Sequence, residues 1–187
     1  MKHLGYPYYV GYLSAAEAHG AAHQRPQVFQ IVTTGRLAGR RFGRVRLTFI
    51  SSAGTASRPT LVVNTPTGTM TVSTPEATVL DLIGEPRHGG GLSNIATIIG
   101  ELLEDDRLNI DEVARVAELY PTSVVQRTGW MIERTAAEIG KDIDLERLAV
   151  IANRRAERTL LSTAGPRRGN TDRRWRVVVN TDVDSDL

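Results

Sequence analysis

The sequence predicts an α+β fold, in which a mixed region of short strands and a helix is followed by a bundle-like helical region and one returning strand. Three observations support this. Residues 28–72 contain four short β-forming runs that glycine or proline separates. Residues 76–152 carry apolar side chains at helical spacing, and residues 175–179 are again β-forming. Strands followed by helices are typical of α+β proteins.

The length of 187 residues is typical of one domain or two small ones. We expect residues 1–110 to form the α+β part and residues 111–187 to form a helical part that ends in the returning strand. The two parts can also form one continuous domain, because no long low-complexity linker separates them.

The N-terminal region predicts a short helix behind a tyrosine-rich segment. Four of the five tyrosines precede it and are expected to form a wall of the core: Tyr6, Tyr8, Tyr9 and Tyr12. Ser14 and Glu17 have the spacing of a capping box, in which the serine caps the helix and the glutamate reaches back. Gly20 is expected to end the helix, since glycine adopts the left-handed conformation readily.

The region that follows predicts strands and a hairpin. Val28–Val32 and Val45–Ile50 have the composition of strands, and the glycine-rich connection at 33–44 is expected to be a turn or a mobile loop. Thr60–Val63 and Thr69–Val72 are two more short strands. The proline and glycine between them predict a hairpin turn.

Five helices are expected in the second half of the chain. Their expected N-terminal caps are Ser73 (paired with Glu76), Ser93, Asp111, Ser123 and Asp144. The fourth helix carries an apolar stripe: Val125, Gly129, Ile132, Ala136 and Ile139. Within it, Gly129 is expected to permit the close approach of a neighbouring element. The fifth helix is expected to carry Arg154, Arg155 and Arg158.

The formal net charge of +2 hides a strong segregation of charge along the chain. Residues 18–75 contain seven arginines and no acidic residue, residues 76–146 have a net charge of −9, and residues 147–176 have a net charge of +7. Lysine accounts for only two of the 23 basic residues. This pattern predicts either charged interaction surfaces or internal pairing of the basic segments with the acidic one.

Composition excludes several classes of protein. The absence of cysteine rules out disulfides, a thiol nucleophile and cysteine-based zinc sites. No apolar run approaches the ~20 residues that cross a bilayer, and the aromatic N-terminus does not have the pattern of a signal peptide. We therefore expect a cytoplasmic protein with no membrane partner.

For each motif that could serve catalysis or metal binding, a structural role explains the residues better. His19 and His23 have the spacing of a helical metal pair, but glycine follows the first histidine where a zinc hydrolase has glutamate. The loop from Arg87 to Ser93 is similar to a phosphate-binding loop but lacks the glycine spacing of a dinucleotide fold, so a hinge is favoured. No Gly-x-Ser-x-Gly elbow is present. The sequence thus predicts no enzyme activity, no metal and no cofactor.

Charged clusters are the candidate sites for partners. The first arginine cluster comprises Arg36, Arg40, Arg41, Arg44 and Arg46. The second comprises Arg154, Arg155, Arg158, Arg167, Arg168, Arg173 and Arg174. An acidic group, formed by Glu101, Glu104, Asp105 and Asp106, is the candidate surface for docking a basic partner. Guanidinium groups bind phosphate and carboxylate in a forked geometry, so nucleic acid and an acidic protein both fit the arginine clusters.

Four segments together resemble a known family. Residues 8–26 read YYVGYLSAAEAHGAAHQRP, and Phe29–Thr33 follows as a strand. Val72–Leu82 reads VSTPEATVLDL, and Arg127–Glu133 reads RTGWMIE. Their order and spacing are similar to those of the C-terminal domain of AbiEi-type antitoxins, from bacterial toxin–antitoxin and abortive-infection operons, and the arginine-rich composition suggests mycobacterial relatives.

The resemblance covers roughly residues 6–140 and implies a non-enzymatic antitoxin that acts, directly or indirectly, against a nucleotidyltransferase toxin that modifies tRNA. Such antitoxins usually carry an N-terminal winged helix-turn-helix that binds their own promoter, which implies promoter DNA and operon autoregulation. Because the resemblance begins near residue 6, we expect no winged helix before it. The alternative is an arginine-rich nucleic-acid-binding regulator without antitoxin activity.

Overall fold

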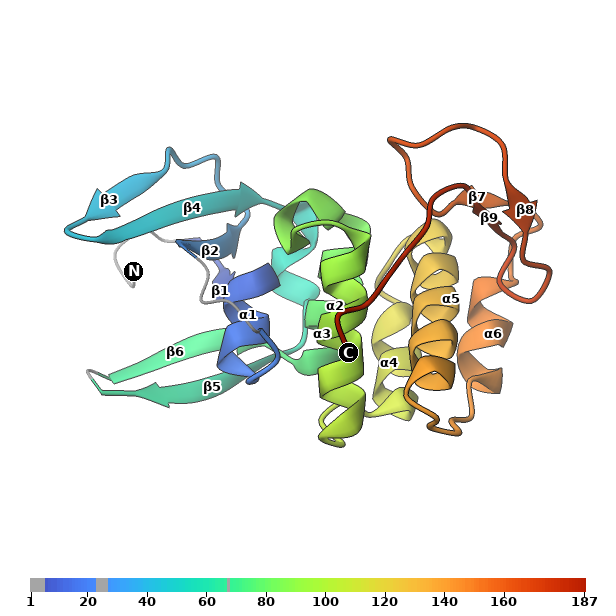
Figure 1. Ribbon diagram of the computed structural model, residues 1–187. Coiled ribbons are helices and arrows are strands. Elements are labelled where there is room, and N and C mark those ends of the chain that lie inside the picture. Colours follow the sequence, from blue (N-terminus) through green and yellow to red (C-terminus); the bar gives the residue numbers. More distant parts are fainter. Residues whose placement is uncertain (1–5, 23–26, 67) are drawn as a thin grey trace.

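The structure, a computed structural model, describes residues 6–22, 27–66 and 68–187 (Figure 1). It confirms the α+β class: over these residues a six-stranded sheet and a short helix come first, five helices follow, and a three-stranded sheet lies near the C-terminal end. In Figure 1 the larger sheet lies on one side of the molecule and helices α4 to α6 on the other, with α2 and α3 between them.

The larger sheet is built from two edge hairpins and two strands between them, β2 and the short β1. Its strands are β1 Tyr8–Val10, β2 Val28–Thr33, β3 Arg40–Phe42, β4 Val45–Ser51, β5 Thr60–Thr65 and β6 Gly68–Ser73. They lie in the order β3-β4-β2-β1-β6-β5, so the β3–β4 and β5–β6 hairpins form the two edges. β1 joins the two halves, antiparallel to β2 and parallel to β6. Both hairpins project away from the helices (Figure 1).

The predicted strands at 28–32 and 45–50 and the hairpin at 60–72 are confirmed. The prediction that the whole 33–44 connection is a loop is wrong, because Arg40–Phe42 pairs with β4 as strand β3. Gly43 lies in the tight turn between the two strands with φ +57°, a conformation that glycine adopts without strain. A strand of three residues, two of them arginines, carries no apolar alternation that would reveal it.

Six helices are described: α1 Tyr12–Ala18, α2 Pro75–Gly84, α3 Leu92–Glu104, α4 Ile110–Ala117, α5 Thr122–Glu138 and α6 Glu146–Ala152. Two 3₁₀ turns, η2 Ala53–Ser57 and η3 Pro86–Gly89, connect elements. The placement of Arg154, Arg155 and Arg158 on a helix is wrong, because α6 ends before them. There the Asn153 side chain donates to the carbonyls of Ala149 and Arg174, at 2.9 and 2.8 Å, and draws the chain toward the C-terminal segment.

Most of the predicted caps are wrong, although the helices exist. The N-cap residues of α1 to α5 are Gly11, Thr74, Gly91, Asn109 and Pro121, in place of the predicted Ser14, Ser73, Ser93, Asp111 and Ser123. The serine hydroxyls bond to distant partners instead: Ser14 Oγ accepts from the Gln30 amide at 2.9 Å, and Ser93 Oγ accepts from the Asp184 amide at 3.2 Å. Gly20, with φ +75° just after α1, ends that helix as predicted.

The C-terminal region forms a second, small sheet. Its strands are β7 Thr159–Leu160, β8 Asn170–Thr171 and β9 Val177–Val179, in the order β7-β9-β8. The last predicted strand therefore pairs within this sheet and does not return to the larger one. Trp175, which precedes β9, is completely buried.

One hydrophobic cluster runs from β1 through the helices to the small sheet. Its members include Tyr9, Leu80, Ile99, Ile132 and Trp175. Helices α2 and α3 pack against α5, so elements on both sides of residue 110 share this core. The division of the chain at that residue stays a prediction. Within the described ranges, no helix is long and apolar enough to cross a membrane.

Candidate functional site

The first arginine cluster lies on the β3–β4 hairpin and the loop before it, which together we call the arginine hairpin (residues 36–46), and all five arginines are exposed. Arg41 Nε donates to the Gly43 carbonyl at 3.1 Å. Among the residues that the structure describes, the side chains of Arg36, Arg40, Arg44 and Arg46 have no hydrogen-bond or ion-pair partner. The internal pairing that the sequence left open does not occur at this cluster.

The geometry of the arginine hairpin concentrates positive charge. Arg41 lies directly opposite Arg46 in the strand register, and like charges in that position destabilise a strand pair. No acidic residue occurs between residues 18 and 75, and the hairpin projects away from the acidic helices (Figure 1). Phe42, which follows Arg41 in β3, has a side chain that is 59% exposed. Unpaired guanidiniums beside an exposed aromatic ring are typical of a surface that binds an anionic partner.

The second arginine cluster is partly paired within the chain. Arg154 forms a two-pronged ion pair with Glu118, and Arg174 pairs with Glu133 and with Glu146. The exposed remainder, without a bonded partner among the described residues, comprises Arg155, Arg158, Arg167, Arg168 and Arg173. Two of the seven guanidiniums are thus held by the acidic segment, and the cluster is spread over the loops around the small sheet.

The acidic group lies at the C-terminal end of α3 and in the turn after it. Asp105 pairs with Arg107 at 3.3 Å and Asp106 with Lys141 at 2.6 Å. Glu104 is exposed, and Glu101 is half-buried. The group is therefore only partly available to a basic partner.

A buried polar cluster, which sequence reasoning missed, joins the larger sheet to the helices. Asp81 of α2 accepts hydrogen bonds from Tyr9 at 2.7 Å and Tyr120 at 2.8 Å, and Arg58 Nε lies 3.6 Å from the same carboxylate. The Arg58 guanidinium also lies over the Tyr120 ring, 3.6 Å from its centroid. We call these four residues the Asp81 cluster. Among the described arginines of the acid-free segment, Arg58 alone reaches a carboxylate.

The electrostatics of the Asp81 cluster follow from its burial. Removal from water raises the pKa of Asp81, while hydrogen bonds from the two tyrosines and the charge of Arg58 oppose that rise. Burial and the neighbouring carboxylate raise the pKa of both Tyr9 and Tyr120, so these hydroxyls stay protonated and donate to Asp81. The one sequence signal was an isolated aspartate within the apolar helix at 77–83. We assign the cluster a structural role.

The RTGWMIE segment of α5 also has a structural role, because it contacts β7 and Trp175. Arg127 Nε donates to the Leu160 carbonyl of β7 at 2.8 Å, and Glu133 accepts from Trp175 Nε1 at 2.7 Å. Between them, Gly129 lies against the indole ring of Trp175, where any Cβ would overlap it. The close approach predicted for Gly129 is confirmed, and its partner is the tryptophan. The segment therefore anchors the small sheet on α5.

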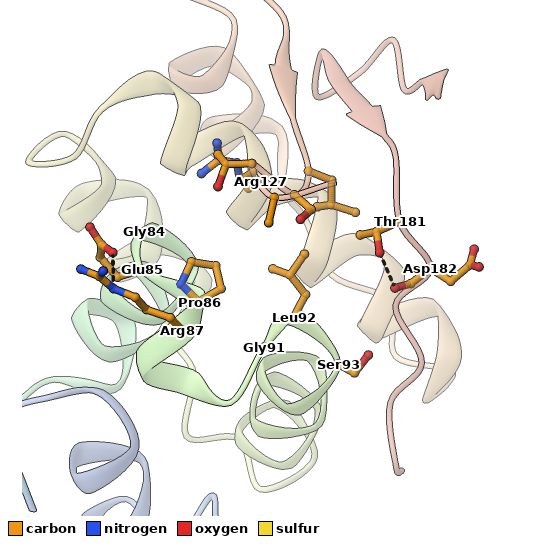
Figure 2. A pocket seen from close by; sticks show the side chains of 14 residues that line it. Gly84, Glu85, Pro86, Arg87, Gly91, Leu92, Ser93, Arg127, Thr181 and Asp182 are labelled. Atoms are coloured by element: carbon orange, nitrogen blue, oxygen red, sulfur yellow. Dashed lines mark hydrogen bonds and ion pairs between the residues drawn. The ribbon is translucent and has the colours of Figure 1, made fainter. Parts of the chain in front are cut away.

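Figure 2 shows a cavity of about 820 Å³ between the Gly84–Ser93 segment and the loop that follows β7. Arg87 pairs with Glu85 at 3.2 Å on one side of the cavity, and the Ser93 hydroxyl already accepts from the Asp184 backbone amide. Gly90 and Gly91 have φ +75° and +97° and turn the chain into α3. This geometry is that of a connection between helices.

Of the two histidines that have the spacing of a metal pair, the structure describes His19. His19 Nε2 bonds to the Ser73 carbonyl at 2.7 Å, and burial lowers the pKa of this imidazole. His23 lies outside the described residues. No group of three or more metal-ligating side chains occurs among the described residues.

Comparison with known proteins supplies the family. No curated protein matches the chain. The crystal structure of the RV2827C protein from Mycobacterium tuberculosis superposes with a TM-score of 0.60 at 15% sequence identity, over 100% of this chain and 64% of that one. At this identity the likeness concerns the fold alone. The sequence profile of the AbiEi antitoxin C-terminal domain matches residues 9–134, from β1 through the whole RTGWMIE segment. The chain therefore belongs to the AbiEi antitoxin family, of which it carries the C-terminal, antitoxin domain.

Proposed function

We propose that this chain neutralises a nucleotidyltransferase toxin that modifies tRNA, and that it does so by contact and not by catalysis. Membership of the family supports an antitoxin role in general. The sequence resemblance to AbiEi-type antitoxins supports this class of toxin. The proposed contact surface is the arginine hairpin, because four of its guanidiniums have no partner in the described chain.

Charge balance explains why the arginine hairpin is the proposed contact. Arg41 opposite Arg46 costs the free chain stability, and an anionic surface on a partner relieves that repulsion. Two of the seven arginines of the second cluster and two of the four residues of the acidic group are already neutralised by internal pairs, and the remaining arginines of that cluster are spread over the loops around the small sheet. An acidic face of the toxin, or the nucleic acid that the toxin uses, fits the hairpin.

Co-expression tests the antitoxin proposal. We expect a nucleotidyltransferase gene beside this one, whose product arrests growth when expressed alone and loses that effect when this chain is co-expressed. A variant with Arg36, Arg40, Arg44 and Arg46 changed to alanine is expected to lose protection while remaining folded by circular dichroism. Growth arrest that persists beside abundant soluble wild-type chain would contradict the proposal.

A second candidate function, binding of nucleic acid such as promoter DNA, is favoured by the exposed Phe42 among the hairpin arginines. Each phosphate contact contributes a slope of about −0.9 to the logarithm of the affinity plotted against the logarithm of the salt concentration. The four-arginine variant is therefore expected to bind its promoter fragment more weakly and with a visibly shallower salt dependence.

A matched variant removes the same number of charges from the second cluster: Arg155, Arg158, Arg167 and Arg168 to alanine. It should keep most of the affinity and the slope if the hairpin carries the binding. Equal losses in the two variants would show a general electrostatic attraction, and no salt-sensitive binding by the wild type would remove this second function.

A further inference from the structure

Strand β5 is an open edge of the larger sheet. It is the last strand in the order, so every second residue of Thr60–Thr65 directs its N–H and C=O away from β6. Over the described ranges, no backbone hydrogen bond closes this side of the strand. The pairing with β6 is continuous, without a bulge that would twist the edge away.

The two edges of the sheet differ in their protection. β3, at the other edge, has three residues and two of them are arginines, which is how proteins prevent edge strands from pairing with another chain. β5 has six residues and no charge, and prolines occur only outside it, at Pro59 and Pro66. The sheet thus has one protected edge and one unprotected edge.

β5 also carries the most exposed large hydrophobic side chain of the described residues. Val62 is 69% exposed and lies on the face of the sheet opposite to that of Leu61 and Val63. Those two are half-buried and pack against the smaller core cluster, which contains Val10 and Val72. Pairing at the β5 edge would extend both faces at once: the apolar face of Leu61 and the exposed face of Val62.

We propose that β5 is a homodimerisation edge, along which the β5 strand of a second copy of this chain pairs in antiparallel orientation. A two-fold axis perpendicular to the sheet makes the two strands antiparallel and keeps each face continuous. With the axis at Val62, this residue lies opposite Val62 of the second copy, and Leu61 lies opposite Val63. Cross-strand pairs of β-branched and aliphatic side chains stabilise such a ladder.

The absence of charge on β5 favours a second copy of this chain as the partner that pairs with this edge. Neither strand of a β5–β5 pair has a charged residue, so self-pairing opposes no like charges. Self-pairing at the other edge would bring Arg40 and Arg41 of two copies together. The association therefore closes at the dimer and does not grow into a fibre. This inference is independent of the proposed antitoxin function.

Sedimentation velocity of the full chain tests the dimer. The wild type is expected to shift from the 20.5 kDa monomer to twice that mass as its concentration rises. Val62→Lys places two ammonium groups opposite each other and is expected to raise the dissociation constant about tenfold. Val150→Lys is the matched control, because Val150 is 66% exposed on α6, away from the sheet, and this variant should dimerise like the wild type.

A charge exchange tests the register. At a concentration where neither variant alone forms much dimer, an equimolar mixture of Val62→Lys and Val62→Glu is expected to recover the dimer, because the two new charges are opposite and face each other. Three results would overturn the proposal: a wild type that stays monomeric at every concentration, a dimer that Val62→Lys leaves intact, or a mixture that gains nothing over its parts.

Discussion

Replacement of Asp81 by alanine is expected to lower the free energy of unfolding by about 3–5 kcal/mol, the usual cost of leaving one member of a buried ion pair without its partner. Arg58 is almost completely buried at the contact. The Tyr9 hydroxyl loses its acceptor at the same time, and the Tyr120 hydroxyl keeps only the Ala77 carbonyl, at 3.2 Å. Urea unfolding followed by circular dichroism measures the loss. Because these residues come from the sheet, the η2–β5 connection, α2 and the turn after α4, the variant is expected to loosen the contact between sheet and helices.

Asp105→Ala is the control for this change. Its pair with Arg107 is exposed on both sides, so the expected loss is below about 1 kcal/mol. A second test replaces both charges, as Arg58→Met with Asp81→Leu, and this double variant should be more stable than Asp81→Ala alone, since no unpaired charge remains. If Asp81→Ala proved as mild as Asp105→Ala, the Asp81 cluster would not be the link that its geometry indicates.

Gly129→Leu is expected to be nearly as damaging. A Cβ at this position overlaps the indole ring of Trp175, and a leucine must displace that ring from its pocket on α5. Overpacking typically costs about 1–3 kcal/mol, and lost burial of a large aromatic side chain about 3–5, so a loss of about 3 kcal/mol or more is expected. Urea unfolding gives the free energy, and a red shift of tryptophan fluorescence, measured in a Trp130→Phe background, reports the displaced Trp175.

Gly84→Ala provides the comparison for this variant, because it adds a methyl group to a helical glycine that has room for it. A Cβ at Gly84 would lie 3.7 Å from a Val124 methyl group, an ordinary contact distance. Alanine is favoured over glycine in a helix, so this variant should equal or exceed the wild type in stability. Equal unfolding midpoints for Gly129→Leu and the wild type would show that the tryptophan does not pack against Gly129.

Local patterns explain how far the sequence predicts this structure. The strands at 28–32 and 45–50 and the helical region follow from the periodicity of apolar residues, which depends on near neighbours. The caps fail because hydroxyls such as those of Ser14 and Ser93 bond to residues far along the chain, at Gln30 and Asp184. The absence of acids nearby in the sequence favours unpaired arginines in the hairpin, and among the described residues no distant acid pairs with Arg36, Arg40, Arg44 or Arg46.

Local sequence patterns could not predict the Asp81 cluster. Tyr9, Arg58, Asp81 and Tyr120 are separated by dozens of residues, and only the folded chain brings them together. The packing at Gly129 is partly predictable. Helical spacing predicts that a neighbouring element packs closely against it, but no local pattern identifies Trp175 as the partner.

The separation of the arginine hairpin from the acidic helices leaves a concentrated positive field at the hairpin, which the net charge of +2 does not reveal. Residues 1–75, which include the larger sheet, have a net charge of +7, and residues 76–146, which include nearly all of helices α2 to α5, have −9. Because the hairpin projects away from these helices (Figure 1), its field attracts an anionic partner to the hairpin before contact. Encounters are then oriented before contact, and added salt slows association more than the small net charge suggests.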